Sequence, residues 1–208
     1  MTKNEAESRE KIEWVNWWIE KAHDITCKRI LLIGDSVARD YRKVLNTRLR
    51  EQGYVIDLLA MSHSIFDNLY LQGIKYYIEV IVAEYQYDYV IFNGGTHHGY
   101  SVSCINQENK QREYCQKLKD ILKVLERINR NIITLGGTPE NVTYPEARND
   151  EIEVRNDLLK SVSLEAGYKF VDLYERLCDK DLFMRDRYHY LEVGNEYITD
   201  IIQEIIVG

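Results

Sequence analysis

Five short apolar runs, rich in β-branched residues, alternate along the chain with longer segments in which apolar side chains recur every three or four positions. The short runs predict buried strands, and the three-and-four spacing predicts amphipathic helices. Strands that alternate with helices form a parallel sheet that is covered on both faces and connected by right-handed crossovers. The pattern predicts a three-layer α/β/α sandwich with a five-stranded parallel sheet. We expect strands at residues 29–33, 54–59, 89–92, 131–135 and 169–173, and helices at 37–51, 69–84, 107–129, 147–165 and 192–206.

The N-terminal segment, about residues 5–23, carries Trp14, Trp17 and Trp18 with aliphatic residues between them. This spacing predicts an extra N-terminal helix, within a helical extension at residues 1–26, that docks on the domain through its tryptophans. In a second interpretation, the same helix mediates self-association or binds a partner. The chain has only two prolines and no low-complexity stretch, so we expect its 208 residues to form one domain.

The net charge of the chain limits the kinds of partner that it can bind. The chain has 34 acidic and 27 basic residues and a net charge of −7, so it lacks the basic surface that binding to nucleic acid or to anionic membranes needs. No apolar run approaches the ~20 residues that span a bilayer, and the N-terminus lacks the apolar core of a signal peptide. We therefore expect a cytoplasmic protein with its four scattered cysteines as free thiols, no nucleic-acid partner and no membrane span.

In parallel sheets, ligands bind beyond the carboxyl ends of the strands. The first predicted strand ends in Gly34, Asp35 and Ser36, just where a helix begins. Glycine permits a tight turn, and a helix N-terminus offers amide donors and a partial positive charge that favour a developing oxyanion. Ser36 is therefore a candidate nucleophile, and the alternative is that Asp35 or Ser36 only caps the helix. A Rossmann-type phosphate loop is excluded because the chain has no G-x-G-x-x-G.

A candidate base for such a serine follows the last predicted strand. Asp186 and His189 lie three residues apart in a turn before the final helix. This separation lets the carboxylate hold the tautomer of the imidazole and stabilise the imidazolium. The alternative is a solvated, charged loop in which His189 merely caps or packs. Because the turns with Ser36 and His189 should open on the same edge of the sheet, their combination favours a Ser-His-Asp arrangement.

In these two blocks the chain resembles the SGNH (GDSL-like) hydrolase superfamily. The sequence GDS at residues 34–36 matches the first block, and DRYH at residues 186–189 matches the D-x-x-H of the last. The resemblance covers nearly the whole chain from residue 29 onward. It implies a flavodoxin-like sandwich with Ser36 as nucleophile, His189 as general base and Asp186 as the group that orients His189.

The turn after the third strand carries NGGTHH at residues 93–98. The superfamily usually has G-x-N-D here, and its asparagine side chain donates to the oxyanion. Gly95 matches, but His97 stands where the asparagine would be, and a neutral imidazole can donate one N–H in its place. In the combination of Arg39, Asn93 and His97, the chain resembles the PC-esterase branch of the superfamily. That branch includes O-acyl esterases and O-acetyltransferases that act on polysaccharides.

Plainer interpretations exist for several of these residues. Arg39, one turn into a helix, is more often a surface ion-pair partner. Adjacent His97 and His98 suggest a metal site, but neighbours on an extended chain point apart, and no further ligand lies at ligand spacing. We therefore expect no metal and no cofactor, and a role for His98 that is limited to the pocket lining. Asp35, Arg39, Asn93, Gly95, His98 and Tyr188 are the expected substrate-binding residues.

The predicted oxyanion hole departs from the superfamily at a second place. A glycine usually follows the second strand, and its backbone N–H donates to the oxyanion, whereas this chain has LLAMSHSIFDN. A backbone donor does not depend on its side chain, so the N–H of Ser62 or Ser64 can serve. We expect Ser64 to do so, together with the N–H of Ser36 and with His97.

Residues 136–149, GGTPENVTYPEARN, follow the fourth strand on the same edge of the sheet. The segment is long enough to be a lid or a substrate wall, and an ordinary surface connection is equally consistent with its sequence. Tyrosines near this edge can stack on a sugar ring: Tyr100, Tyr144, Tyr188 and Tyr190.

The resemblance implies a serine esterase that removes a small O-acyl group, acetyl above all, from a carbohydrate or glycoconjugate through an acyl-enzyme. Two alternatives remain. An O-acetyltransferase would pass the same acyl group to a sugar hydroxyl. A catalytically inactive binding protein would retain only the fold, and the two departures in the oxyanion hole motivate this interpretation.

Overall fold

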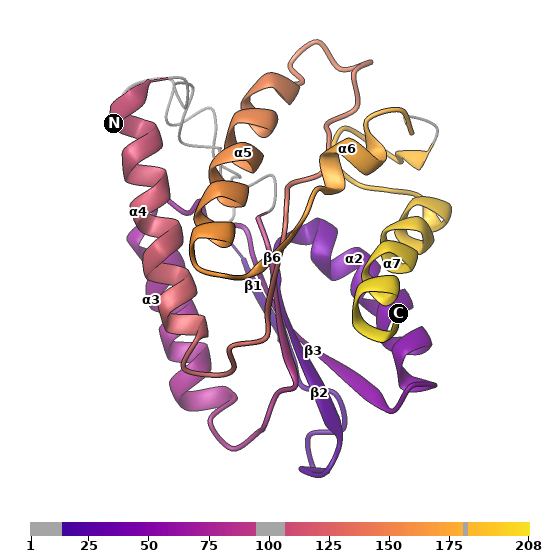
Figure 1. Cartoon of the computed structure of the whole chain (residues 1–208). Helices are drawn as coiled ribbons and strands as arrows, with labels where there is room; N and C mark the ends of the chain where they lie inside the picture. Colours follow the sequence, from indigo (N-terminus) through magenta and orange to yellow (C-terminus); the bar gives the residue numbers. More distant parts are fainter. Residues whose placement is uncertain (1–13, 95–106, 181–182) are drawn as a thin grey trace.

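The computed structural model describes residues 14–94, 107–180 and 183–208 (Figure 1). It contains a six-stranded sheet in the order β1-β3-β2-β4-β5-β6. The five strands from β2 to β6 are parallel, and β1 pairs with β3 in the antiparallel direction. The strands are β1 (Val15–Trp18), β2 (Lys28–Gly34), β3 (Tyr54–Met61), β4 (Tyr89–Asn93), β5 (Ile132–Leu135) and β6 (Lys169–Val171).

Helices cover both faces of this sheet, which confirms the predicted sandwich (Figure 1). One face is covered by α3, α4 and α5, and the other by α2, α6 and α7. A π-helical turn, η1, continues α3. Among the described residues, none of the helices combines the length and the apolar character that crossing a bilayer requires. The helices are α2 (Ser36–Arg50), α3 (Asn68–Tyr76), η1 (Tyr77–Ile81), α4 (Glu108–Leu125), α5 (Asn149–Glu165), α6 (Leu173–Leu177) and α7 (Glu192–Val207).

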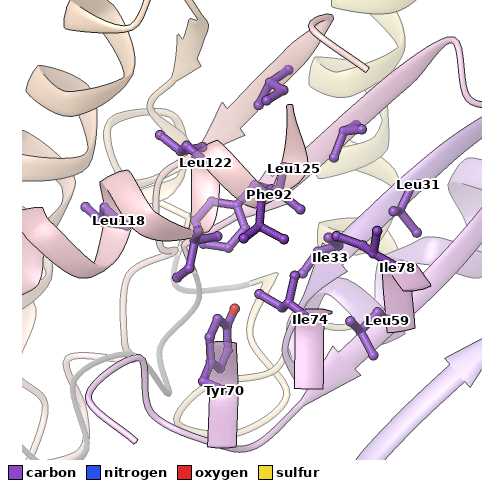
Figure 2. Close-up of a cluster of buried hydrophobic side chains, with 14 of the residues drawn as sticks. Leu31, Ile33, Leu59, Tyr70, Ile74, Ile78, Phe92, Leu118, Leu122 and Leu125 are labelled. Atoms are coloured by element: carbon purple, nitrogen blue, oxygen red, sulfur yellow. The ribbon is translucent and has the colours of Figure 1, made fainter. Parts of the chain in front are cut away.

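Alternate side chains of the central strand β2 point to opposite faces of the sheet. Leu31 and Ile33 pack against the layer of α3, α4 and α5 (Figure 2). Ile30 and Leu32 pack against α2 and α7. A strand that is buried on both faces reads as a continuous apolar run, which is why β2 was recognisable in the sequence.

The strand order places the candidate site. Counted without β1, the five parallel strands follow the order 2-1-3-4-5, which is the flavodoxin-like order. Beyond β2 the chain enters a helix on one face, and the helix that follows β4 lies on the other face. In such sheets ligands bind at this switch point, beyond the carboxyl ends of the two strands. Ser36 directly follows β2 and lies at this point.

The predicted N-terminal helix is wrong in the described part of residues 1–26. Residues 15–18 form β1, in which Trp17 lies opposite Leu59 of β3. The N–H of Trp14 donates to Oγ of Ser62 at 2.8 Å, and the N–H of Ser62 donates to the carbonyl of Trp14 at 3.1 Å. The uncovered edge of β3 offers backbone partners that a docked helix would leave unpaired, and Val and Trp favour strands. Trp17 and Trp18 stay about half exposed, and self-association through them remains a prediction.

A buried ion pair holds the chain that leads from β1 into β2. Arg29, near the amino end of β2, lies 3.0 Å from Asp57 of β3, and both side chains are 0% exposed. Tyr87 donates its hydroxyl to the same carboxylate at 2.7 Å. This ion pair is near the end of the sheet opposite Ser36, so it offers a control for substitutions at the site.

Candidate active site

The turn between β2 and α2 presents Ser36 as the first residue of the helix. A Cβ on Gly34 would lie 2.5 Å from Cβ of Ala38, so the close approach of turn and helix requires glycine. Asp35 is the N-cap, and its carboxylate accepts the N–H of Val37 at 2.9 Å. The cap and the serine are therefore not alternatives, because Asp35 caps the helix while Ser36 occupies its N-terminus.

The turn before α7 brings an imidazole to this serine across 153 positions of sequence. Nε2 of His189 lies 2.9 Å from Oγ of Ser36. Nδ1 of His189 lies 3.0 Å from each carboxylate oxygen of Asp186. Nδ1 therefore donates its proton to the carboxylate, which leaves Nε2 free to accept the proton of the serine hydroxyl. Ser36, His189 and Asp186 thus form one continuous hydrogen-bonded chain.

The backbone of the same turn keeps Asp186 charged. Oδ1 of Asp186 accepts the N–H of Tyr188 and the N–H of His189, both at 2.9 Å. Partial burial raises the pKa of this carboxyl, but the two backbone donors and the neighbouring imidazole outweigh it and hold the pKa below its ordinary value. On its other side, Nε of Arg185 lies 3.5 Å from Oδ2. An ionised carboxylate is what an orienting acid in a Ser-His-Asp arrangement needs.

Ser62 and Ser64, the two serines after β3, differ in the hydrogen bonds that their backbone groups make. The N–H of Ser62 is bonded to the carbonyl of Trp14 and is directed to the edge strand. Ser64 lies in the following turn, where its carbonyl accepts the N–H of Asp67 at 2.9 Å. Ser62 and Ser64 are the two candidates for a backbone oxyanion donor after β3, and the N–H of Ser62 is committed to the sheet.

Three of the predicted pocket residues, Gly95, His97 and His98, lie outside the described residues, as does Tyr100. Asn93 is buried, and its side-chain amide donates to the hydroxyl of Tyr41 at 3.0 Å. Its side chain also lies next to the turn that carries Ser36, since a Cβ added to Gly34 would be 3.2 Å from the Cβ of Asn93.

Two further predicted substrate-binding residues lie close in sequence to the site residues. Arg39 follows Ser36 within α2, and Tyr188 directly precedes His189. The guanidinium of Arg39 lies over the ring of Trp14, 5.1 Å from its centroid, and pairs with Asp40 at 3.2 Å. Tyr188 meets the ring of His189 edge-on, with centroids 6.4 Å apart. The structure therefore places Tyr188 against the ring of His189, and it gives Arg39 the surface ion pair that the plainer interpretation of the sequence named.

The segment at residues 136–149 is buried in its first part and exposed in its middle. It packs on the turn that carries His189, because the hydroxyl of Tyr190 donates to the carbonyl of Pro139 at 3.3 Å. Glu140 and Arg187 join the two segments as an ion pair. The sequence pattern indicates a role for neither residue, since Arg187 is only a spacer within D-x-x-H and nothing in the pattern links it to Glu140.

Within the described part of the chain, no group of three His, Cys, Asp or Glu side chains could hold a metal ion. Cys27, Cys115 and Cys178 are free thiols. The groups that the described site offers for chemistry include a serine hydroxyl, an imidazole and a carboxylate.

No family model and no curated protein matches this sequence. Solved structures do match. The acetyl xylan esterase AlAXEase is 15% identical with a TM-score of 0.68, and the match covers 86% of this chain and 100% of that one. An acetylxylan esterase from Geobacillus stearothermophilus is 16% identical with a TM-score of 0.61, covering 87% and 94%. The lipase/acylhydrolase from Enterococcus faecalis is 16% identical with a TM-score of 0.63, covering 86% and 95%. The chain therefore has the fold of these esterases and acylhydrolases, in agreement with the sandwich that the resemblance to the SGNH (GDSL-like) hydrolases implies.

Proposed function

We propose that this protein is a serine esterase that hydrolyses a small O-acyl ester, acetyl in the first place, on a carbohydrate or glycoconjugate. The observation that carries the proposal is the hydrogen-bonded chain from Asp186 through His189 to Ser36, at 3.0 and 2.9 Å. The acetyl xylan esterases of the same fold and the resemblance to the PC-esterase branch support the substrate class.

In the first step, Oγ of Ser36 attacks the ester carbonyl carbon. As the new C–O bond forms, the serine proton moves to Nε2 of His189 and the carbonyl electron pair moves to oxygen. Asp186 stabilises the resulting imidazolium. The oxyanion forms at the N-terminus of α2, a 15-residue helix whose dipole and first N–H groups favour negative charge there.

In the second step, the tetrahedral intermediate collapses and the bond to the leaving alcohol breaks. The alcohol oxygen takes the proton from Nε2 of His189, which leaves an acyl group on Ser36. A water molecule then attacks the acyl carbon, with His189 again accepting the proton. Breakdown of this second intermediate releases the carboxylic acid and restores the serine.

For the other oxyanion donors we propose the N–H of Ser64 and the side chain of His97. The commitment of Ser62 to the edge strand supports Ser64 over its neighbour. The assignment of His97 depends on the resemblance alone.

The alternatives differ from this proposal in ways that can be measured. The alignment of Ser36, His189 and Asp186 favours an enzyme over an inactive binding protein, since a binding protein has no need of it. An O-acetyltransferase would use the same acyl-enzyme and differ only in the acceptor. Incubation with an acetyl donor and a sugar acceptor separates the two by product, acetate or acetylated sugar.

The proposal is tested with p-nitrophenyl acetate and with acetylated xylo-oligosaccharides. We expect Ser36→Ala and His189→Ala each to lower kcat/KM by about 10³-fold or more, because each removes a member of one cooperating unit. Matched substitutions at exposed positions, Ser161→Ala and His23→Ala, should leave the rate unchanged. Equal rates in the wild type and in a folded Ser36→Ala variant would refute the proposal.

A further inference from the structure

A shielded ion pair links the turn that carries the base to the segment after β5. Arg187 donates from Nε and from Nη2 to Oε2 of Glu140, at 2.8 and 2.7 Å. The side chain of Glu140 is 4% exposed and that of Arg187 is 19% exposed. Water screens such a pair only weakly, and the loss of one partner leaves an uncompensated charge in a dry environment.

Glu140 is fixed at both its backbone and its side chain. Its N–H donates to Oδ1 of Asn149 at 2.8 Å, and Nδ2 of Asn149 donates to its carbonyl at 2.9 Å. Its carboxylate also accepts the N–H of Arg148 at 3.0 Å. Because Asn149 is the first residue of α5, Glu140 is tied to a helix that packs on the sheet. The carboxylate is therefore a rigid receptor for the guanidinium.

Arg187 makes further contacts with the same segment. Its carbonyl accepts the N–H of Asn141 at 2.9 Å, and its Nη2 also donates to the carbonyl of Glu146. The guanidinium lies over the ring of Tyr188, 4.9 Å from the centroid. The backbone and the side chain of Arg187 thus dock together on residues 140–146.

The position of Arg187 within the turn makes this docking relevant to the base. At the foot of the turn, the N–H of Arg185 donates to the carbonyl of His189 at 2.7 Å. Arg187 lies between these two residues, at the tip. A movement of the tip would carry His189 with it, and so change the 2.9 Å separation between Nε2 and Oγ of Ser36.

We propose that the Glu140–Arg187 ion pair positions the catalytic base, by clamping the tip of its turn so that Nε2 of His189 stays within hydrogen-bond reach of Ser36. This inference rests on the proposed function. Both residues act through His189 and are positioning residues. The pair supplies the support that a catalytic side chain on a loop needs, because small misplacements of a reacting group have large effects on rate.

The test uses Arg187→Met, Glu140→Gln and the double variant. We expect each single substitution to lower kcat with p-nitrophenyl acetate by about 30-fold or more, with KM changed by less than about threefold, because a misplaced base affects the transition state and not ground-state binding. The double variant should be no worse than the worse single variant, since the two residues form one interaction. Arg187→Lys keeps the charge but not the fork of donors, so it should recover part of the loss.

The control must separate positioning from general stability. Asp57→Asn breaks a comparably buried ion pair near the opposite end of the sheet. We expect it to lower Tm at least as much as Arg187→Met does, and to leave kcat unchanged at temperatures well below Tm. Equal losses of kcat in Asp57→Asn and Arg187→Met would overturn the inference.

A second readout does not depend on esterase activity. The Nδ1 proton of His189, identified in ¹H–¹⁵N spectra by its loss in His189→Ala, should be sharp in the wild type and exchange-broadened in Arg187→Met and Glu140→Gln. If the wild type hydrolyses no ester, the proposed function fails and this spectrum still tests the clamp. An unchanged Nδ1 signal in both variants would overturn the clamp, whatever the activity.

Discussion

Substitution of Asp186 by asparagine tests the direction of the hydrogen bonds at the proposed site. Oδ1 of Asp186 accepts two backbone N–H groups at 2.9 Å, so the amide oxygen of an asparagine must take that position. The amide NH₂ then falls at the position of Oδ2, 3.0 Å from Nδ1 of His189. The amide oxygen is equally close to Nδ1, but it already accepts two backbone N–H groups. Because the NH₂ group cannot accept a proton from Nδ1–H, we expect the imidazole proton to shift to Nε2. His189 would then donate to Ser36 and could no longer accept its proton.

The expected effect on rate is large, while the effect on stability is small. Loss of the correct tautomer in a Ser-His-Asp site costs about 10⁴-fold in kcat, which corresponds to about 5 kcal/mol in the activation free energy. The Asp186 side chain is 42% exposed, and solvent screening keeps its contribution to folding below about 1 kcal/mol. Asp186→Asn should therefore lose activity without a matching loss of Tm.

The assay is kcat/KM for p-nitrophenyl acetate between pH 5 and about pH 9, together with thermal unfolding followed by circular dichroism. Asp200→Asn, an exposed position on α7, is the matched control and should behave as the wild type does. A folded Asp186→Asn variant that retains more than about a tenth of the wild-type rate would show that the tautomer argument is wrong.

Two further predictions concern the turn and the carboxylate. Gly34→Ala places a Cβ 2.5 Å from Cβ of Ala38, so we expect it to lower the free energy of unfolding by about 1–3 kcal/mol and to displace Ser36. Urea denaturation measures the first effect and the esterase rate measures the second. A variant as stable and active as the wild type would contradict this account of the turn. The pKa of Asp186 is lowered in the folded state, so its contribution to stability is present above its ordinary pKa of 3.8 and is lost as pH falls through the folded value. The difference in unfolding free energy between wild type and Asp186→Asn should accordingly be constant at neutral pH and shrink below about pH 4, and a difference that grows on acidification would show that the sign is wrong.

Much of the fold and part of the proposed site follow from patterns that are local in the sequence. Strands buried on both faces are continuous apolar runs, so β2 to β5 are recognisable without partners. Ser36 stood out because a glycine and a capping residue precede it at a helix start, and Asp186 and His189 because they are three residues apart. Each of these signals depends on neighbours within one turn of chain.

The remaining features depend on partners that are distant in the sequence. Trp14, Trp17 and Trp18 have a spacing that suits a helix, yet residues 15–18 form a strand because the edge of β3 offers them backbone partners. The same pairing commits the N–H of Ser62 to the edge strand, which nothing near Ser62 in the sequence indicates. Arg187 and Glu140 are 47 positions apart, and only the packing of two loops makes them an ion pair. Local periodicity reports which face of an element is buried, whereas the choice of an edge partner or of a counter-ion is made between segments that meet only after folding.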